Sequence, residues 1–175
     1  MTHEDILSNT AFFAETPVEA LTAIAASAKS QTLQRGDVLF NEGDTPDALF
    51  VVLSGRIAIA IGNKPLDSRE SMLALMEDGD LFGELGLLDS GSRSAMARAI
   101  ETSSVLCIPY APVVEQMRTH PTMLWGVTKL LATRLRVMDE VLADSVFLDV
   151  TGRTAKRLLE LSGGSDDFVL PVTQE

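Results

Sequence analysis

The chain has 175 residues, which is enough for one well-buried core and some additional elements. Its 14 basic and 25 acidic residues give a net charge of −11, so we do not expect this chain by itself to bind the phosphate backbone of DNA well. The single cysteine, Cys107, excludes a disulfide framework, and the apolar run around it predicts a buried thiol.

The first predicted element is a helix that begins near residue 16. Thr16, Pro17 and Glu19 combine a capping hydroxyl, a proline at the first helical position and a glutamate three residues after the cap. We expect this helix to run through Ala25. Before it, a short apolar cluster is expected to pack the N-terminal arm against the body of the protein; its members are Ile6, Leu7, Phe12 and Phe13.

Between residues 33 and 110 the pattern changes to short runs of β-prone residues. Glycine-containing turns such as Arg35-Gly36-Asp37 and Asp78-Gly79-Asp80 separate these runs. The expected strands cover residues 37–40, 49–53, 56–61, 71–76, 95–100 and 104–108. Many short strands with glycine turns predict an antiparallel sandwich or barrel and not a βαβ fold.

Two helices are predicted after the strands, a short one over residues 111–118 and a long one over residues 121–145. Along the long helix, Leu124, Leu131 and Met138 belong to an apolar stripe with three- and four-residue spacing. The stripe could pack entirely on the chain's own barrel. However, a helix of about 25 residues is about 37 Å long, which is more than a small domain needs, and this length favours a dimer interface.

The C-terminal segment predicts the beginning of a second domain. Residues 147–153 lead into an amphipathic helix through Leu158 and Leu161, which Gly163-Gly164 should end. Residues 173–175 are typical of a helix start, so we interpret the chain as truncated. We therefore expect a sensor domain with its long helix over residues 1–145, and the first part of a second domain over residues 146–175.

The segment 80–95 has the chemistry of a site for a small phosphorylated ligand. Gly83 and Gly86 allow the backbone to approach an anion, and Arg93 offers a planar set of donors that Ser94 can supplement. Glu84 would repel a phosphate, but it could accept a hydrogen bond from a ribose hydroxyl. An ordinary solvated loop would also fit these residues taken alone.

The motifs in this segment resemble those of a known family. Phe-Gly-Glu-Leu at 82–85 and Arg-Ser-Ala at 93–95 resemble the phosphate-binding cassette of cyclic nucleotide-binding domains. Residues 35–55 resemble the first barrel strands of that family, and residues 147–153 are similar to its hinge segment in the cyclic AMP receptor protein branch. By this resemblance the chain is identified as a member of the cyclic AMP receptor protein/fumarate-nitrate reductase regulator superfamily.

The resemblance implies a mainly β fold with flanking helices, namely a double-stranded β-helix (jelly-roll) barrel followed by a long dimerisation helix. It also implies that Glu84 holds the ribose hydroxyl, that Arg93 with Ser94 holds the cyclic phosphate, and that Leu73 and Ala74 line the base pocket. The complete set of implied ligand-binding positions is Gly83, Glu84, Leu85, Arg93, Ser94, Leu73, Ala74, Arg134, Met138 and Asp139.

The long helix departs from the family pattern at two positions. Arg134 matches a family arginine that lies near the phosphate, but the adenine-contacting hydroxyl or amide residues are replaced here by Met138 and Asp139. Methionine offers no strong hydrogen bond, while an aspartate can accept from adenine or, in bidentate fashion, from guanine. Asp139 could also be only a solvated helix residue. We expect a weaker or altered response to cyclic AMP, in which cyclic GMP could compete.

The implied function is that of a ligand-sensing homodimer in a bacterial transcription regulator. Cyclic AMP would act as the allosteric ligand, and the long helix would transmit its binding to a helix-turn-helix DNA-binding domain beyond the chain. No signal peptide or membrane-spanning run is visible in the sequence, which favours the cytoplasm and no membrane partner.

Three other interpretations remain. The pocket could have lost its ligand, leaving a constitutive or differently triggered regulator whose barrel serves as a dimerisation scaffold. A haem-binding gas sensor could use His120 or methionine ligands. An enzyme or a metal site is not favoured, because His3 is expected in a flexible arm and His120 precedes Pro121, without a nucleophile or clustered ligands nearby.

Overall fold

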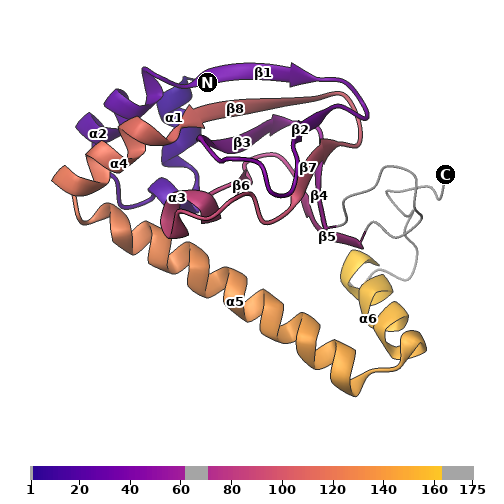
Figure 1. Cartoon of the computed structure of the whole chain (residues 1–175). Helices are drawn as coiled ribbons and strands as arrows, with labels where there is room; N and C mark the ends of the chain where they lie inside the picture. The colour runs from indigo at the N-terminus through magenta and orange to yellow at the C-terminus, as the bar shows by residue number, and fades with distance from the viewer. Residues whose placement is uncertain (1, 62–70, 163–175) are drawn as a thin grey trace. The chain divides into compact units, whose positions relative to one another are not determined.

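The computed structural model describes residues 2–61 and 71–162 (Figure 1). The chain divides after Leu130 into two compact units. The first unit holds all the strands together with the N-terminal helices, and the second holds the greater part of the long helix and the helix that follows it. Each unit is described by itself below.

The first unit is built from two antiparallel sheets of four strands each. One sheet has the order β1-β8-β3-β6, with bounds Lys29–Leu33, Ser103–Pro109, Ala48–Ser54 and Leu81–Phe82. The other has the order β2-β7-β4-β5, with bounds Val38–Phe40, Met96–Ala99, Ile57–Ile61 and Ser71–Met76. These two orders are those of a jelly-roll barrel, so the predicted barrel is confirmed.

Three turns of the barrel share one local design. In Gln34–Asp37, Asn41–Asp44 and Glu77–Asp80, the aspartate carboxylate accepts a hydrogen bond from the backbone N–H three residues earlier, at 2.8, 2.8 and 2.9 Å. The glycine before each aspartate has a φ of 93, 86 or 88°, a conformation that residues with a side chain rarely adopt. The sequence pattern Gly-Asp therefore marks turns that the backbone closes in the same way each time.

Strand β3 is buried on both of its faces. All five residues Ala48–Val52 are buried, although neighbouring side chains on a strand point to opposite faces. Leu49 and Val51 pack in a cluster with the N-terminal helices, whereas Phe50 and Val52 pack in a second cluster inside the barrel. A continuous apolar run, in place of an alternating one, is the sequence signature of such a two-sided strand.

The helices of the first unit lie at one end of the sheets in Figure 1. They include α1 (His3–Ser8), the 3₁₀ helix η1 (Ala11–Phe13), α2 (Val18–Ala25) and α4 (Tyr110–Thr119). Leu7, Phe12 and Phe13 are each at most 1% exposed, which confirms that the N-terminal arm packs against the body. The predicted flexible arm around His3 is wrong, because that residue begins α1.

The capping prediction at Thr16 is also wrong. Helix α2 begins at Val18 with Pro17 at the N-cap and no side-chain cap, and the buried Thr16 hydroxyl has no hydrogen-bond partner among the described residues. A reciprocal capping box is found at α1 instead, where the Thr2 side chain accepts from the Asp5 N–H and the Asp5 carboxylate accepts from the Thr2 N–H. Tertiary packing of α2 overrides the local signal.

Two further differences concern the sheet with β1. Strand β1 was not predicted, because four of its five residues are exposed and polar or charged at an outer position of the sheet. Cys107 on β8 is only partly buried, so the predicted buried thiol is wrong; burial still raises the pKa of this thiol.

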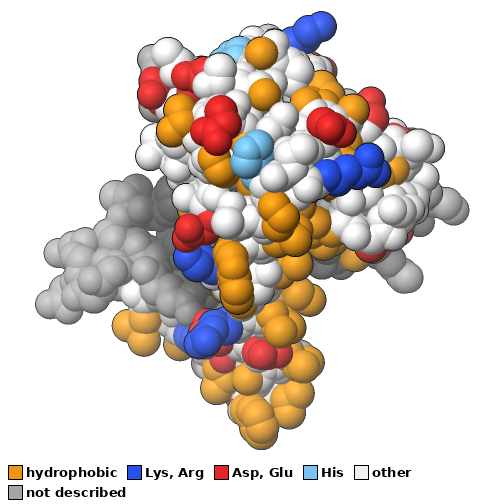
Figure 2. Space-filling model, turned by 90° about the vertical axis from the view of Figure 1, so that its left-hand side faces the viewer, with side chains coloured by type: hydrophobic (Ala, Val, Ile, Leu, Met, Phe, Trp, Pro, Cys, Tyr) orange, Lys and Arg blue, Asp and Glu red, His pale blue; other side chains and the backbone are white. Residues whose placement is uncertain are grey.

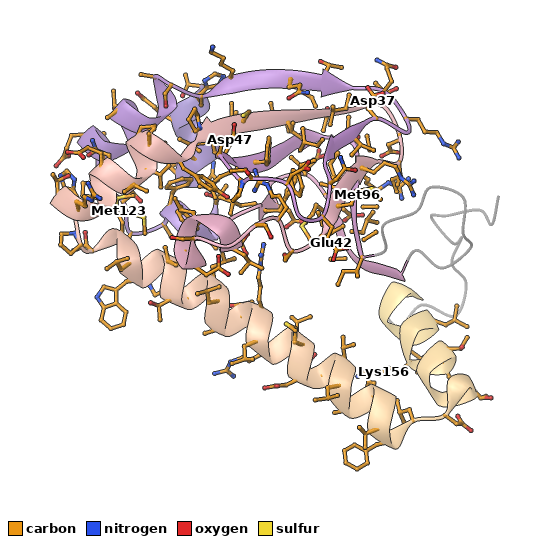
Figure 3. All side chains as sticks on the ribbon, viewed as in Figure 1. Asp37, Glu42, Asp47, Met96, Met123 and Lys156 are labelled. Carbon is orange, nitrogen blue, oxygen red and sulfur yellow. The ribbon has the colours of Figure 1, made fainter. Side chains whose placement is uncertain are left out.

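The long helix α5 (Met123–Phe147) has 25 residues and confirms the prediction to within two residues at each end. Its first turns belong to the first unit, where Met123, labelled in Figure 3, is 1% exposed. In the second unit, α6 (Val150–Ser162) follows, and Asp149 accepts a hydrogen bond from the Gly152 N–H at 2.7 Å at its start. Lys156, labelled in Figure 3, forms an ion pair of 2.6 Å with Asp144 of α5.

The expected end of this helix at Gly163-Gly164 lies outside the described residues. Over residues 2–61 and 71–162, no helix combines the length and the apolar character that crossing a membrane requires.

Candidate functional site

The candidate cassette is the connection between β6 and β7, residues 83–95. It contains α3 (Leu85–Asp89), a single short turn of helix that ends at Ser90 in the left-handed conformation, with a φ of 58°. Two backbone hydrogen bonds hold the cassette to the turn before β3: Gly43 N–H donates to Arg93 O at 2.8 Å, and Arg93 N–H donates to Asp44 O at 2.9 Å. One of the three Gly-Asp turns thus serves as the platform for the cassette.

Glycine at position 83 is required by both conformation and space. Its φ is 80°, and a Cβ atom built there would lie 2.8 Å from Nη1 of Arg93 and 3.4 Å from the carbonyl oxygen of Ala48. A side chain at this position would therefore displace the arginine. Gly86 packs with similar closeness, since a Cβ there would lie 2.5 Å from Pro46.

Arg93 is buried, with 4% of its side chain exposed. Its Nη1 donates to the carbonyl oxygen of Gly83 at 3.0 Å and to the hydroxyl of Tyr110 at 3.1 Å, while Nη2 donates to the carbonyl oxygen of Ala48 at 2.8 Å. The carboxylate of Asp47, labelled in Figure 3, lies 3.9 Å from Nη2. Of the five guanidinium N–H groups, the described residues leave the Nε–H and one Nη2–H for another acceptor.

Aromatic rings surround the same guanidinium. Its carbon lies 4.2 Å from the ring centroid of Phe40 and 5.5 Å from that of Phe50. Phe50 in turn stacks on Phe82 at 5.4 Å. A cation held over ring faces in a buried environment gains electrostatic stabilisation and keeps a fixed orientation.

Glu84 follows directly after the glycine and is 1% exposed. Its backbone oxygen accepts from the Leu87 N–H at 3.0 Å, and its carboxylate is close enough to Tyr110 to contribute to raising the pKa of that phenol. A buried carboxylate and a buried guanidinium therefore lie on one loop. This pairing offers an acceptor for a sugar hydroxyl and a cation for a phosphate.

Tyr110 belongs to this site, and sequence reasoning missed it. Its hydroxyl donates to the Gly83 carbonyl and accepts from Arg93. Burial is the main cause that raises the pKa of Tyr110 above its usual value. No local signal identifies it, because it is 17 residues from Arg93 and stands at the junction of β8 and α4.

The remaining predicted positions of the first unit lie around this centre or on the second sheet. Ser94 is exposed, and Leu85 is exposed to 42%. Ala74 on β5 is partly buried and pairs with Ile59 of β4. Leu73 precedes it on the same strand, and its side chain lies outside what the structure describes.

The three predicted helix positions belong to the second unit. Arg134 is partly buried there, and Asp139 and Met138 are exposed, Met138 to 68%. The structure thus brings together Gly83, Glu84 and Arg93 within one unit, and it describes the helix positions separately.

The next feature is the set of metal-ligating side chains in the described part of the chain. No group of three or more His, Cys, Asp or Glu residues within it could hold a metal ion. His120 lies 3.7 Å from the carboxylate of Glu19 and 3.0 Å from the Thr119 hydroxyl, at the end of α4. His120 therefore joins the end of α4 to α2.

Comparison with known proteins decides the family. A family model described as "Cyclic nucleotide-binding domain" matches residues 30–120. The CRP-like cAMP-activated global transcriptional regulator of Mycobacterium tuberculosis is 31% identical over 175 residues, which cover 98% of this chain and 77% of the relative. The chain belongs to the cyclic nucleotide-binding domain family, in the cyclic AMP receptor protein superfamily.

Two further family members show the same relationship. The cAMP-activated global transcriptional regulator Vfr of Pseudomonas aeruginosa is 37% identical over 133 residues, covering 74% of this chain and 61% of that protein. The crystal structure of Thermus thermophilus Catabolite Activator Protein is 31% identical, with a TM-score of 0.65, and covers 89% of this chain and 72% of that one. The first of these relatives is described as a transcriptional regulator and the second as an activator protein, and the predicted family and fold are confirmed.

Proposed function

We propose that this chain is the ligand-sensing and dimerisation part of a bacterial transcription regulator and that cyclic AMP is its ligand. Two relatives described as cAMP-activated, one of them matching 98% of the chain, support the ligand class. The observation that carries the proposal is the pair of buried opposite charges, Arg93 and Glu84, on the family's cassette loop. A guanidinium and a carboxylate buried on one loop suit a ligand that carries both a phosphate and a sugar hydroxyl, as a nucleotide does.

In this proposal each cassette residue has a separate role. The Nε–H and the remaining Nη2–H of Arg93, with Ser94, hold the cyclic phosphate, and Glu84 accepts from the ribose hydroxyl. Gly83 and Leu85 shape the loop, while Leu73 and Ala74 line the base pocket. Cyclic AMP carries one negative charge at its phosphate, which one arginine can balance.

The base preference would be set on the long helix. Arg134 would approach the phosphate, and Met138 and Asp139 would stand where family members place adenine-binding groups. Since methionine provides no strong hydrogen bond and aspartate only accepts, we expect weaker or altered cyclic AMP binding in which cyclic GMP competes.

Dimerisation through the long helix is supported by its uncovered apolar residues. Leu135, Met138 and Leu142 are exposed to 60, 68 and 64% and fall at spacings of three and four residues. Figure 2 shows hydrophobic side chains gathered along this helix. In the proposed homodimer, two such stripes cover one another, and ligand binding changes how they pack.

The proposed output is DNA binding by a helix-turn-helix domain that follows the chain. Residues 1–145 would form the sensor with its helix, and residues 146–175 would be the hinge and the first part of the DNA-binding domain. The net charge of −11 agrees with this division of labour, because such a surface by itself repels DNA. The regulator would act in the cytoplasm.

A second candidate is the same fold without a ligand. Three protein acceptors already take three of the five N–H groups of the Arg93 guanidinium, which is also compatible with a purely structural role for this residue. Met138 and Asp139 also depart from the adenine-binding pattern. Under this alternative the barrel is a constitutive or differently triggered dimerisation scaffold.

Isothermal titration of cyclic AMP, then of cyclic GMP, separates the two candidates. Saturable heat with the wild-type chain is expected, and Arg93→Ala should weaken cyclic AMP binding by roughly tenfold to more than a hundredfold, since charge-assisted hydrogen bonds are lost. Arg56→Ala is the matched control, because Arg56 makes a bidentate ion pair with Glu101 outside the cassette, at 3.0 Å for both bonds.

The possible outcomes differ clearly. Binding that Arg93→Ala leaves unchanged within about threefold removes the cassette assignment. An absence of heat with either nucleotide favours the scaffold. Tight cyclic AMP binding that excludes cyclic GMP would contradict the expected effect of Met138 and Asp139.

A further inference from the structure

Tyr110, the single tyrosine of the chain, joins three parts of the candidate site. Its hydroxyl donates to the carbonyl oxygen of Gly83 and accepts from Nη1 of Arg93 at 3.1 Å. Its backbone N–H donates to the carbonyl oxygen of Asp47 at 2.8 Å, directly before β3. One residue therefore connects the cassette, the buried arginine and the end of the barrel from which α4 begins.

The hydroxyl of Tyr110 has no substitute within the described residues. The other hydrogen bonds of the Arg93 guanidinium go to main-chain carbonyls, and the Asp47 carboxylate at 3.9 Å is too distant for a hydrogen bond. A phenol is neutral well below its usual pKa of 10.0, and burial raises this pKa further, so the hydroxyl can donate to Gly83 while it accepts from Arg93. Both hydrogen-bonding capacities of the hydroxyl are in use.

This arrangement orients the arginine before any ligand arrives. With Nη1 held by Gly83 and Tyr110, the guanidinium cannot rotate about its terminal bonds without breaking two hydrogen bonds. A side chain that is already ordered loses less conformational freedom on binding, and its two remaining N–H groups keep one direction. The geometry therefore points to a role for Tyr110 in recognition that goes beyond packing.

We propose that Tyr110 is the positioning residue of the phosphate site, which holds Arg93 ready for the ligand and ties it to the first turn of α4. This inference rests on the proposed function. If it holds, removing the hydroxyl weakens nucleotide binding through Arg93 alone, whereas a tyrosine with only a structural role would change stability and leave the affinity unaffected.

The test is a double-mutant cycle on the complete 175-residue chain, with cyclic AMP as the titrant. Tyr110→Phe removes only the hydroxyl and should raise the dissociation constant about threefold to tenfold. In the Arg93→Lys background the same change should alter it by less than about twofold, because a lysine lacks the Nη1 group that Tyr110 contacts.

Thr10→Val is the matched control for losing a buried hydroxyl. Thr10 is 3% exposed and donates to the carbonyl oxygen of Leu7 at 2.8 Å, within the N-terminal arm. This variant should unfold at a lower denaturant concentration than the wild type and should keep the wild-type affinity for cyclic AMP.

The outcomes distinguish the inference from the proposed function. No saturable binding by the wild-type chain overturns the proposed function and the inference with it. Wild-type binding that Tyr110→Phe leaves within about twofold overturns the inference alone. Equal losses in the wild-type and Arg93→Lys backgrounds also overturn it, because Tyr110 would then act independently of Arg93.

A second measurement keeps the inference testable if Tyr110→Phe does not fold. Because the chain has one tyrosine, labelling with 3-fluorotyrosine gives a single ¹⁹F resonance from position 110. This resonance should shift on titration with cyclic AMP, with the same midpoint as the calorimetric curve. A resonance that stays in place while calorimetry shows binding overturns the inference.

Discussion

The two units of the chain differ in how far their large hydrophobic side chains are buried. In the first unit, Leu49, Ile57 and Leu106 are completely buried by other parts of the same chain. In the second unit, Leu142 and Phe147 are exposed to 64 and 82%. The barrel closes its core by itself, whereas the long helix has an apolar surface that its own unit does not cover. An exposed apolar stripe of this kind is a surface that a partner can cover.

The exposure of apolar side chains changes within one helix, α5. At the start of α5, Met123 and Val127 are 1 and 5% exposed, and two turns later Leu135 is exposed to 60%. Leucine is as apolar as methionine and valine, so residue type at these three positions does not explain the difference. Met123 and Val127 pack in the core of the first unit, whereas large apolar side chains of the later turns are exposed.

The largest expected effect is on self-association. Leu142→Asp places a charge in the exposed stripe and should convert a dimer into a monomer, because a charge in an apolar interface must be desolvated. Analytical ultracentrifugation of both proteins at equal concentration measures this. Ala143→Asp, which lies about 100° around the helix and is also exposed, is the control and should stay dimeric. A wild-type chain that is monomeric would contradict dimerisation through the long helix.

The next effect concerns the closed core of the first unit. Leu106→Ala should lower the free energy of unfolding by about 2–5 kcal/mol, because the side chain is fully buried and leaves a cavity. Leu142→Ala, measured by urea unfolding at a concentration that keeps the chain monomeric, should change it by about 0.5 kcal/mol or less. Equal losses at both positions would show that the helix surface is covered within the chain.

A pair of glycines shows that the tight packing extends into the candidate site. Gly43→Ala faces open space and should lose about 1–2 kcal/mol from its left-handed backbone alone. Gly83→Ala should lose a further 1–3 kcal/mol, roughly, because its Cβ would meet Arg93, and it should also weaken nucleotide binding. Urea unfolding and calorimetry measure the two quantities. If the two variants behave alike, the contact between Gly83 and Arg93 is not restrictive.

The smallest effect is a pH dependence that arises from Tyr110. Burial raises the pKa of this phenol in the folded chain above its usual value of 10.0. The folded state then retains a proton that the unfolded state releases, so this stabilisation is present below pH 10 and is lost as the pH rises through the folded pKa. Between pH about 8 and about 11, the wild-type chain should lose more stability than Tyr110→Phe.

Urea unfolding of both proteins at the two pH values measures the difference. Cys107, whose pKa is also raised, titrates in both proteins, so its contribution cancels. Parallel losses in the two proteins would contradict the burial of Tyr110.

Local sequence patterns were sufficient for much of the fold. The strands at 49–53, 56–61 and 71–76 and the long helix were predicted because apolar periodicity and glycine turns are properties of neighbouring residues. Strand β1 was missed because its residues are mostly exposed, and Thr16 misled because a capping hydroxyl can be overruled by packing. The domain boundary near residue 145 and the ligand roles of the site residues stay predictions.

By itself the sequence predicted an antiparallel sandwich or barrel and a long helix with an apolar stripe, since both patterns lie in residues close together along the chain. Its resemblance to a known family added the jelly-roll class and the cassette with Gly83, Glu84 and Arg93. Only the tertiary structure decided what Arg93 contacts. Its partners Ala48 and Tyr110 are 45 and 17 residues away and contribute a main-chain carbonyl and a phenol, groups whose meeting no local pattern encodes. The closing of the barrel brings them together, because pairing of β3 with β8 sets Ala48 opposite Pro109 and so beside Tyr110.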